Sequence, residues 1–141
     1  MHLSYVASRP IVAGPPTVVN VVLRHVVAVA AAISAGVHVA LVPDHWAEGG
    51  PTLGLAFAVA GVAAGAVALF VRRPEHDVWA PLAAAIVLAA TVLAYALSRT
   101  VGVPWLISEP EGLDPLGVLT TVAELFGAVS GLLLTTRKDP A

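Results

Sequence analysis

The chain contains no cysteine, which excludes disulfides, cysteine-based zinc sites, iron–sulfur clusters and thiol chemistry. Charged residues are also scarce: they make up 11% of the 141 residues, whereas about a quarter of a typical soluble domain is charged. The few Lys and Arg residues form no basic patch, so we expect no nucleic-acid partner. The Gly-x-Ser-x-Gly and His-Glu-x-x-His signatures of hydrolases are missing as well, and no feature indicates an enzyme.

Most of the remaining sequence is apolar, since 58% of the residues are hydrophobic. Four apolar segments stand between the charge clusters, and each has about the ~20 residues needed to cross ~30 Å of hydrocarbon. They lie at 17–42, 52–71, 78–97 and 116–136. We therefore predict an all-α polytopic integral membrane protein, a four-transmembrane-helix bundle in the lipid bilayer of the cell membrane. Residues 1–16 and 137–141 are predicted to be cytoplasmic tails.

The basic residues predict an orientation. All Lys and Arg except Arg99 fall beside the two ends of the chain or in the 72–77 turn, whereas Arg99 lies among the acids of the other two loops. The positive-inside rule then places both termini in the cytoplasm and both acidic loops outside. A cleaved signal peptide ending within 30–35 is a weaker alternative, because apolar sequence continues to Val42.

Small residues recur at helical spacing in two of the segments. Gly61 and Gly65 lie four residues apart in the second segment, as do Gly127 and Gly131 in the fourth. Such spacing lets another backbone approach closely, so we expect these glycines at contacts between helices.

Polar residues enter the first apolar segment from both ends. His38 and His45 are seven residues apart and therefore share one side of a helix, and Ser34, Arg24 and Asn20 extend that side backwards. In the fourth segment Glu124 stands eight residues deep, where an ionisable group is expensive unless it faces the bundle interior. The predicted depths make a contact between His38 and Glu124 feasible.

Two imidazoles and carboxylates are donors that suit Zn or Cu. We expect a metal site with the ligands His38, His45, Glu124 and Glu48, supported by Arg99, Tyr95, Ser98 and Asp44. Haem is not expected, because the second, third and fourth segments contain no histidine. Two other interpretations stay open. Glu124 and His38 carry a proton, or they only hold helices together, with Glu124 hydrogen-bonded to Thr91, Tyr95 or a histidine. For Arg99 the favoured role is a salt bridge that holds the outer loop.

The His38-x6-His45 spacing, the Ser-Arg-Thr-Val-Gly-x-Pro run at 98–104 and Glu124 resemble a group of small four-helix bacterial membrane proteins. That resemblance implies a fold but no activity. From the residues themselves we expect an outward-facing His/Glu site that binds a transition metal for sensing, delivery or transport. The alternative is a non-catalytic accessory or scaffold subunit, whose glycine faces dock a larger membrane complex. A membrane-protein partner or a homo-oligomer fits either interpretation.

Overall fold

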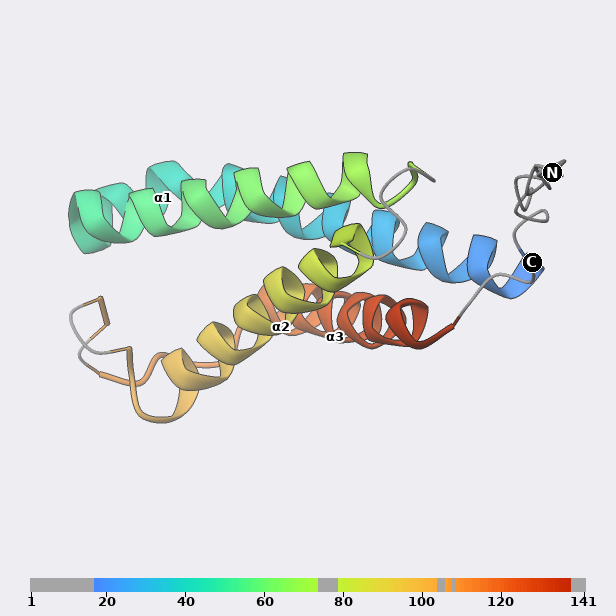
Figure 1. The fold of residues 1–141 in the computed structure, drawn as a ribbon. Helices are drawn as coiled ribbons and strands as arrows, with labels where there is room; N and C mark the ends of the chain where they lie inside the picture. Colours follow the sequence, from blue (N-terminus) through green and yellow to red (C-terminus); the bar gives the residue numbers. More distant parts are fainter. Residues whose placement is uncertain (1–16, 74–78, 104–105, 108, 138–141) are drawn as a thin grey trace, which may run out of the picture.

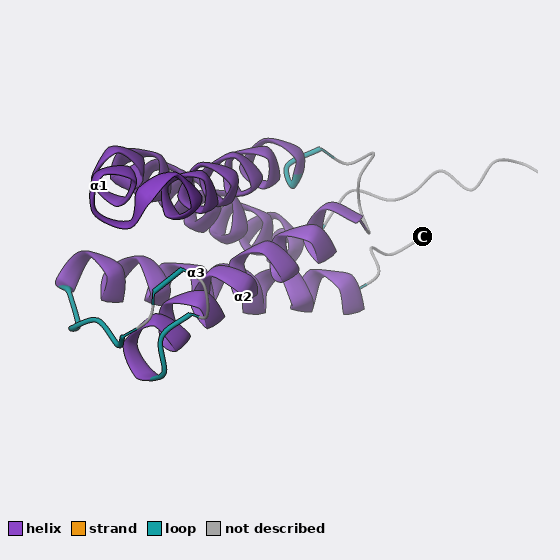
Figure 2. Ribbon diagram, turned by 90° about the vertical axis from the view of Figure 1, so that its left-hand side faces the viewer, coloured by secondary structure: helices purple, strands orange, loops and turns teal. Residues whose placement is uncertain are grey.

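The computed structural model describes residues 17–73, 79–103, 106–107 and 109–137. They form three helices, α1 (Val18–Phe70), α2 (Trp79–Thr100) and α3 (Pro115–Thr136), and one isolated β-bridge between Val103 and Ile107 (Figures 1 and 2). The predicted tails, apart from Arg137, and most of the predicted 72–77 turn lie outside the described residues.

α1 folds back on itself at a single residue. Its 53 residues would extend about 80 Å as a straight helix. Gly50 alone departs from helical geometry, with φ 77° and ψ −178°, in a region that is essentially restricted to glycine. Pro51 follows, and proline is favoured at the first position of a helical stretch. The two arms of α1, 18–49 and 51–70, therefore lie side by side (Figure 1).

The two arms pack through glycines. A Cβ added at Gly61 would stand 2.7 Å from Val39 Cγ2 and 3.3 Å from the carbonyl oxygen of Ala35. Near the reversal, a Cβ at Gly54 would meet the side chain of Trp46 at 2.6 Å. The backbones of the arms approach at these positions because no side chain separates them.

The prediction of four separate helices is wrong. The described residues contain three helices, and each of the three is long and apolar enough to cross a membrane. The prediction ended the first helix at Pro43 and assigned 43–51 to a loop, but Pro43 lies inside α1. Proline is tolerated in a membrane helix whose neighbours compensate for the lost hydrogen bond, and here Trp46 packs residues after Pro43 against the second arm. The start of α1 and the end of α3 nevertheless lie at the same end of the molecule (Figure 1), and the side of the membrane that this end faces stays a prediction.

α3 packs against α2 and the first arm of α1 through its own glycines. A Cβ added at Gly127 would stand 2.6 Å from Leu88 Cδ1 and 2.7 Å from Ala30 Cβ, and one at Gly131 would stand 2.8 Å from the carbonyl oxygen of Pro81. The prediction that Gly127 and Gly131 lie at helix contacts is confirmed. Around them is a closed apolar core whose fully buried members include Val27, Ala31, Ala84 and Leu88.

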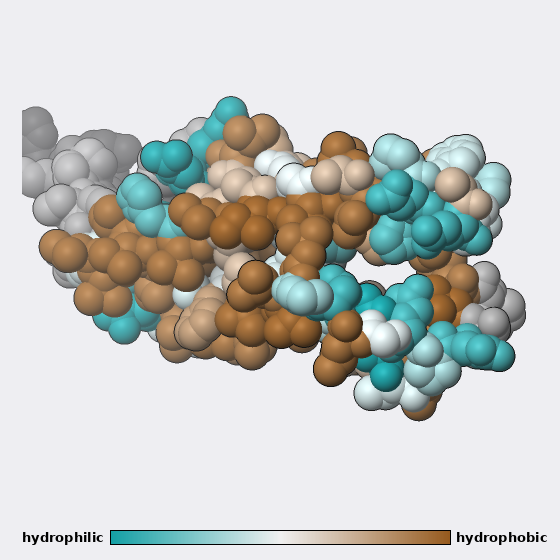
Figure 3. Space-filling model, turned by 180° about the vertical axis from the view of Figure 1, so that it is seen from behind, coloured by the Kyte–Doolittle hydropathy of each residue, from teal (hydrophilic) through white to brown (hydrophobic). Residues whose placement is uncertain are grey.

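The outer surface of the helices is apolar. Val59, Leu69, Leu119 and Phe126 are each mostly exposed, and Figure 3 shows hydrophobic residues along most of the molecule's length. A soluble monomer rarely exposes so continuous an apolar surface. Together with the three long apolar helices, this surface indicates a multi-pass membrane protein whose helices contact the lipid bilayer.

Among the described residues, the carboxylates other than Glu124 lie at one end of the molecule and the arginines other than Arg99 lie at the other. The reversal of α1 and the connection between α2 and α3 form what we call the acidic end, with the described carboxylates Asp44, Glu48, Glu109, Glu111 and Asp114. The start of α1, the end of its second arm and the end of α3 form the basic end. There the Arg24 Nη1 donates to the Val71 carbonyl oxygen at 2.8 Å, and the Arg137 Nε donates to the Asn20 Oδ1 at 3.1 Å.

Candidate functional site

Glu124 is the carboxylate that the fold buries most deeply. It lies on the face of α3 that packs against the other helices, and only 2% of it is exposed. A carboxyl group in the apolar interior of a membrane protein costs several kcal/mol unless hydrogen bonds compensate for the lost water. The partners of Glu124 therefore decide whether the fold tolerates it.

Ser34 supplies the shortest of these hydrogen bonds. Its Oγ donates to the Glu124 Oε1 at 2.6 Å, across 90 residues of sequence, and Ser34 is fully buried. α2 contributes Thr91, whose side chain lies near the Glu124 carboxyl group. The Thr91 Oγ1 donates to the carbonyl oxygen of Leu88 at 2.8 Å, which fixes its rotamer on the helix. All three helices thus provide a side chain to one polar cluster.

His38 extends this cluster towards the acidic end. Its Nδ1 lies 2.9 Å from the carbonyl oxygen of Ser34, 3.3 Å from the Ser34 Oγ and 3.9 Å from the Glu124 Oε1. A carbonyl oxygen can only accept, so we infer that Nδ1 carries the proton of the neutral ring and that Nε2 is its basic nitrogen. The side chain is 17% exposed, whereas that of Glu124 is 2% exposed. His38 is therefore the more accessible member of the pair.

Phe57 contacts two of the three histidines of the first arm, His38 and His45. The His45 ring stacks on the Phe57 ring with centroids 3.7 Å apart and an angle of 22° between the planes. The His38 ring stands 5.3 Å from the same Phe57 ring, at 39°. The Nδ1 of His45 donates to the carbonyl oxygen of Leu41 at 2.9 Å, so each imidazole has its Nδ1 tied to its own helix.

A cleft opens at the acidic end beside His45. It has a volume of about 290 Å³ and lies between the reversal of α1 and the connection that follows α2, where Figure 3 shows a hollow between two hydrophilic groups. Its polar lining comes from His45, Glu48, Glu109 and Glu111. The side of the molecule nearer to His38 is thus polar and hollowed.

The opposite side of Glu124 is closed. One turn towards the basic end, Gly127 contacts Leu88 and Ala30, and Ala31 precedes Ser34 by one turn on α1. Leu88, Ala31 and Val27 are each 0% exposed. Towards the basic end, Glu124 is therefore enclosed by packed apolar side chains.

Arg99 fastens the connection between α2 and α3. Its Nη1 donates to the Glu111 Oε2 at 2.7 Å and its Nη2 to the Asp114 Oδ2 at 2.8 Å, while its guanidinium lies 4.6 Å from the centre of the Tyr95 ring. Asp114 also caps α3 by accepting from the backbone N–H of Gly117. The predicted salt bridge that holds the outer loop is confirmed, with Asp114 as a partner that the prediction had not named. Arg99 does not contact Glu124.

The structure brings together only part of the predicted metal site. His38 and Glu124 meet, but His45 is held against Phe57, and Glu48 and Asp44 are exposed. Within the described ranges no three His, Asp or Glu side chains are grouped so that they could hold one metal ion. Of the supporting residues, Tyr95 and Arg99 lie in the Arg99 cluster, and the Ser98 carbonyl oxygen accepts from the Glu111 N–H at 2.9 Å.

One contributor to the site, Phe57, was missed from the sequence. Phe57 is one aromatic residue in an uncharged apolar segment, and nothing in its spacing distinguishes it from a lipid-facing side chain.

Comparison of the chain with protein-family models, with curated proteins and with solved structures finds no match to any of them, so the site's own geometry carries the functional argument.

Proposed function

We propose that this chain is a small multi-pass protein of the cell membrane that binds and releases a proton at Glu124. The proton exchanges with the acidic end through Ser34 and His38. The protein then responds to proton concentration on that side of the membrane, as a sensing or regulatory component.

The observation that carries this proposal is the continuous hydrogen-bonded chain from Glu124 through Ser34 to His38. The hydroxyl of Ser34 both donates and accepts, so it can pass a proton between its 2.6 Å and 3.3 Å neighbours. Imidazole is the side chain that most readily changes charge near neutral pH. An ionisable residue inside a membrane bundle is by default a candidate functional group, and proton relays are built from such Glu and His chains.

The closed core below Glu124 favours proton binding over proton conduction. A conducting path would need polar groups or water on both sides of the carboxyl group, and the apolar residues Val27, Ala31 and Leu88 fill the side towards the basic end. This closure supports a site that exchanges protons with the acidic end only.

The metal-binding and scaffold interpretations have less support. A metal ion needs more donors than His38 and Glu124, and the described residues supply no further histidine or carboxylate at that place. The scaffold interpretation used the glycine faces to dock a partner, but Gly61, Gly127 and Gly131 are occupied by contacts inside the chain. The part of the scaffold interpretation that remains is a structural role for Glu124, whose carboxyl group only holds the helices together by hydrogen bonds.

Infrared difference spectroscopy of the protein in lipid, recorded between acid and alkaline pH, separates proton exchange from a structural role. We expect a carboxylic-acid C=O band that appears and disappears with pH in the wild type and is lost in Glu124→Gln. The matched control is Glu48→Gln, which removes an exposed carboxyl group and should leave this band unchanged. Ser34→Ala and His38→Gln should move the pH at which the band appears.

Two results would contradict the proposal. If the difference spectra of the wild type and Glu124→Gln are identical, the carboxyl group exchanges no proton over the pH range. If the Glu124 band is present and constant at every pH, the group is a permanently neutral hydrogen-bonding partner, and the structural role is correct.

A further inference from the structure

The two histidines near the acidic end of α1 have different surroundings. His38 belongs to the buried cluster with Ser34 and Glu124, whereas His45 lines the cleft at the acidic end. The lining of that cleft includes His45 but not His38. A proton that enters through the cleft and reaches Glu124 by way of His38 must therefore cross the distance between the two imidazoles.

The helix determines how long this distance is. The first arm of α1 is helical throughout 18–49, so the seven residues from His38 to His45 separate their Cα atoms by about 10.5 Å. In both side chains the Nδ1 lies 2.9 Å from the carbonyl oxygen four residues earlier, so the two rings are turned in the same way. The rings are consequently almost as far apart as the Cα atoms, which is too far for a hydrogen bond between them.

Phe57 occupies the interval between the two imidazoles. Its ring centre lies 3.7 Å from that of His45 and 5.3 Å from that of His38, and these two distances together nearly span the separation of the histidines. Phe57 belongs to the second arm, which the reversal at Gly50 brings alongside the first (Figure 1). The His45 and Phe57 rings are in van der Waals contact, so a water molecule does not fit between them.

The first arm adds only apolar side chains to this interval. Leu41 and Val42 lie one turn after His38, on the same side of the helix. The carbonyl oxygen of Leu41 already accepts from the Nδ1 of His45. Aromatic and aliphatic carbon neither donate nor accept a proton, so a proton crosses here when the Phe57 ring turns aside and admits water. Phe57 is only partly buried, which leaves its ring room to turn.

We propose that Phe57 is an aromatic gate between the cleft at the acidic end and the buried cluster, and that it sets the rate at which protons reach Glu124. The inference rests on the proposed function, because it concerns the route of the same proton. The gate governs how fast the carboxyl group equilibrates with the acidic side. It leaves the number of protons that Glu124 binds unchanged.

Time-resolved infrared spectroscopy after a pH jump, on the full chain in lipid, tests the gate. The signal is the carboxylic-acid C=O band of Glu124. Phe57→Ala should speed the change of this band by about tenfold or more, which corresponds to a barrier lower by about 1.4 kcal/mol, and should leave its amplitude unchanged. Phe57→Gln should also speed it, because an amide fills part of the same volume and hydrogen-bonds with water. Phe57→Leu keeps an apolar side chain in place and should keep the wild-type rate.

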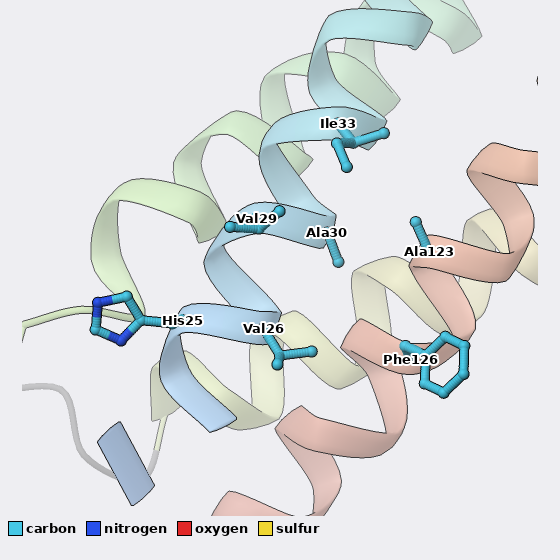
Figure 4. Close-up of a pocket in the computed structure, with 7 residues that line it drawn as sticks. All are labelled: His25, Val26, Val29, Ala30, Ile33, Ala123 and Phe126. Atoms are coloured by element: carbon cyan, nitrogen blue, oxygen red, sulfur yellow. The ribbon is translucent and has the colours of Figure 1, made fainter. Parts of the chain in front are cut away.

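The matched control is Phe126→Ala, the same substitution at a different surface. Phe126 is 66% exposed and lines an open apolar groove between α1 and α3, where Figure 4 shows it across from Val26. The lining of this groove includes neither Phe57 nor His38. Loss of the Phe126 ring should leave the rate unchanged, which separates removal of a gate from a general loosening of the helices. Thermal melts establish which variants are folded, and either Phe57→Ala or Phe57→Gln suffices if the other unfolds.

Two results would overturn the gate without affecting the proposed function. If the Glu124 band of the wild type and of a folded Phe57→Ala or Phe57→Gln variant changes at the same rate, protons reach the carboxyl group by another route. If the band loses amplitude in such a variant, the Phe57 ring is a structural support of the cluster and not a gate.

A band that is constant with pH in the wild type and in both variants would instead contradict the proposed function. The exchange of the His38 ring N–H with water, measured by NMR, then decides the gate separately. Faster exchange in Phe57→Ala and Phe57→Gln than in the wild type and Phe126→Ala supports a barrier at Phe57, and equal exchange in all four proteins overturns it.

Discussion

Ser34 is the side chain on which the buried polar cluster depends most. It is fully buried, it bonds the carboxyl group of another helix, and its backbone carbonyl orients His38. A hydrogen bond to a charged or strongly polar group inside a membrane protein contributes on the order of 1–2 kcal/mol, and removal of one partner leaves the other unsatisfied.

We therefore expect Ser34→Ala to lower the free energy of unfolding in detergent by about 1–2 kcal/mol. The matched control is Ser98→Ala, because Ser98 is also buried but its hydroxyl donates only to the Tyr95 carbonyl oxygen of its own helix. Thermal or denaturant unfolding of both variants is the measurement. Equal losses in the two variants would show that the contact between Ser34 and Glu124 adds nothing specific.

Arg99 acts at the surface, where ion pairs are weaker. Two partly exposed pairs contribute about 0.2–1 kcal/mol each, so Arg99→Gln should speed backbone amide exchange at Glu111 by roughly two- to thirtyfold. The Glu111 amide is a suitable probe because it donates to the Ser98 carbonyl oxygen. Arg73→Gln, at the basic end, is the control that should leave this exchange rate unchanged. High salt should reduce the difference between wild type and Arg99→Gln, and a difference that persists in high salt would argue against ion pairing as its cause.

The reversal of α1 depends on the backbone of one residue. At φ 77° and ψ −178° Gly50 occupies a region where a Cβ is strained, which costs on the order of 1–3 kcal/mol. Gly50→Ala should lower stability by that amount, although no atom lies within 4 Å of the added Cβ. Gly36→Ala is the control, since Gly36 is helical and equally uncrowded, and it should be neutral or stabilising by up to about 1 kcal/mol. A neutral Gly50→Ala variant would show that the reversal does not require this backbone geometry.

The contact between α2 and α3 depends on how closely their backbones approach. A Cβ at Gly131 would lie 2.8 Å from the Pro81 carbonyl oxygen and 3.1 Å from the Ala85 N, and neither backbone atom can move without shifting α2. We expect Gly131→Ala to lower the melting temperature in detergent. Gly65→Ala should not, because its Cβ would meet only the Ala35 Cβ, at an ordinary 3.7 Å. If Gly131→Ala and Gly65→Ala have the same melting temperature, close packing at Gly131 contributes no stability.

The sequence predicted the contacts that follow from residue spacing or from the cost of turning a polar side chain towards lipid. Gly61, Gly127 and Gly131 were placed at contacts from their spacing, and the convergence of His38 with Glu124 followed from the expense of turning either towards lipid. The course of the chain at 43–51 was not predictable in this way. A local rule ended the helix at Pro43, whereas the contact of Trp46 with Gly54 is a tertiary effect. The stacking of His45 on Phe57, which separates it from the predicted metal ligands, is tertiary as well.

The whole molecule is asymmetric along its length. The acidic end holds the cleft, His45 and the Arg99 cluster, the middle holds Glu124, and the basic end is separated from Glu124 by the apolar core. Under the proposed function, the acidic end is the one that exchanges protons with the buried carboxyl group.

The most direct test of the central claim is the number of protons bound from each end, measured by potentiometric titration of the protein in proteoliposomes of known orientation. When the acidic end faces the titrated solution, the wild type should bind about one proton per chain more than Glu124→Gln, because one carboxyl group has been removed. When only the basic end faces it, the two proteins should bind equally. Equal binding in both orientations, or an excess in the wild type from the basic end, would contradict a proton site at Glu124 that opens to the acidic end.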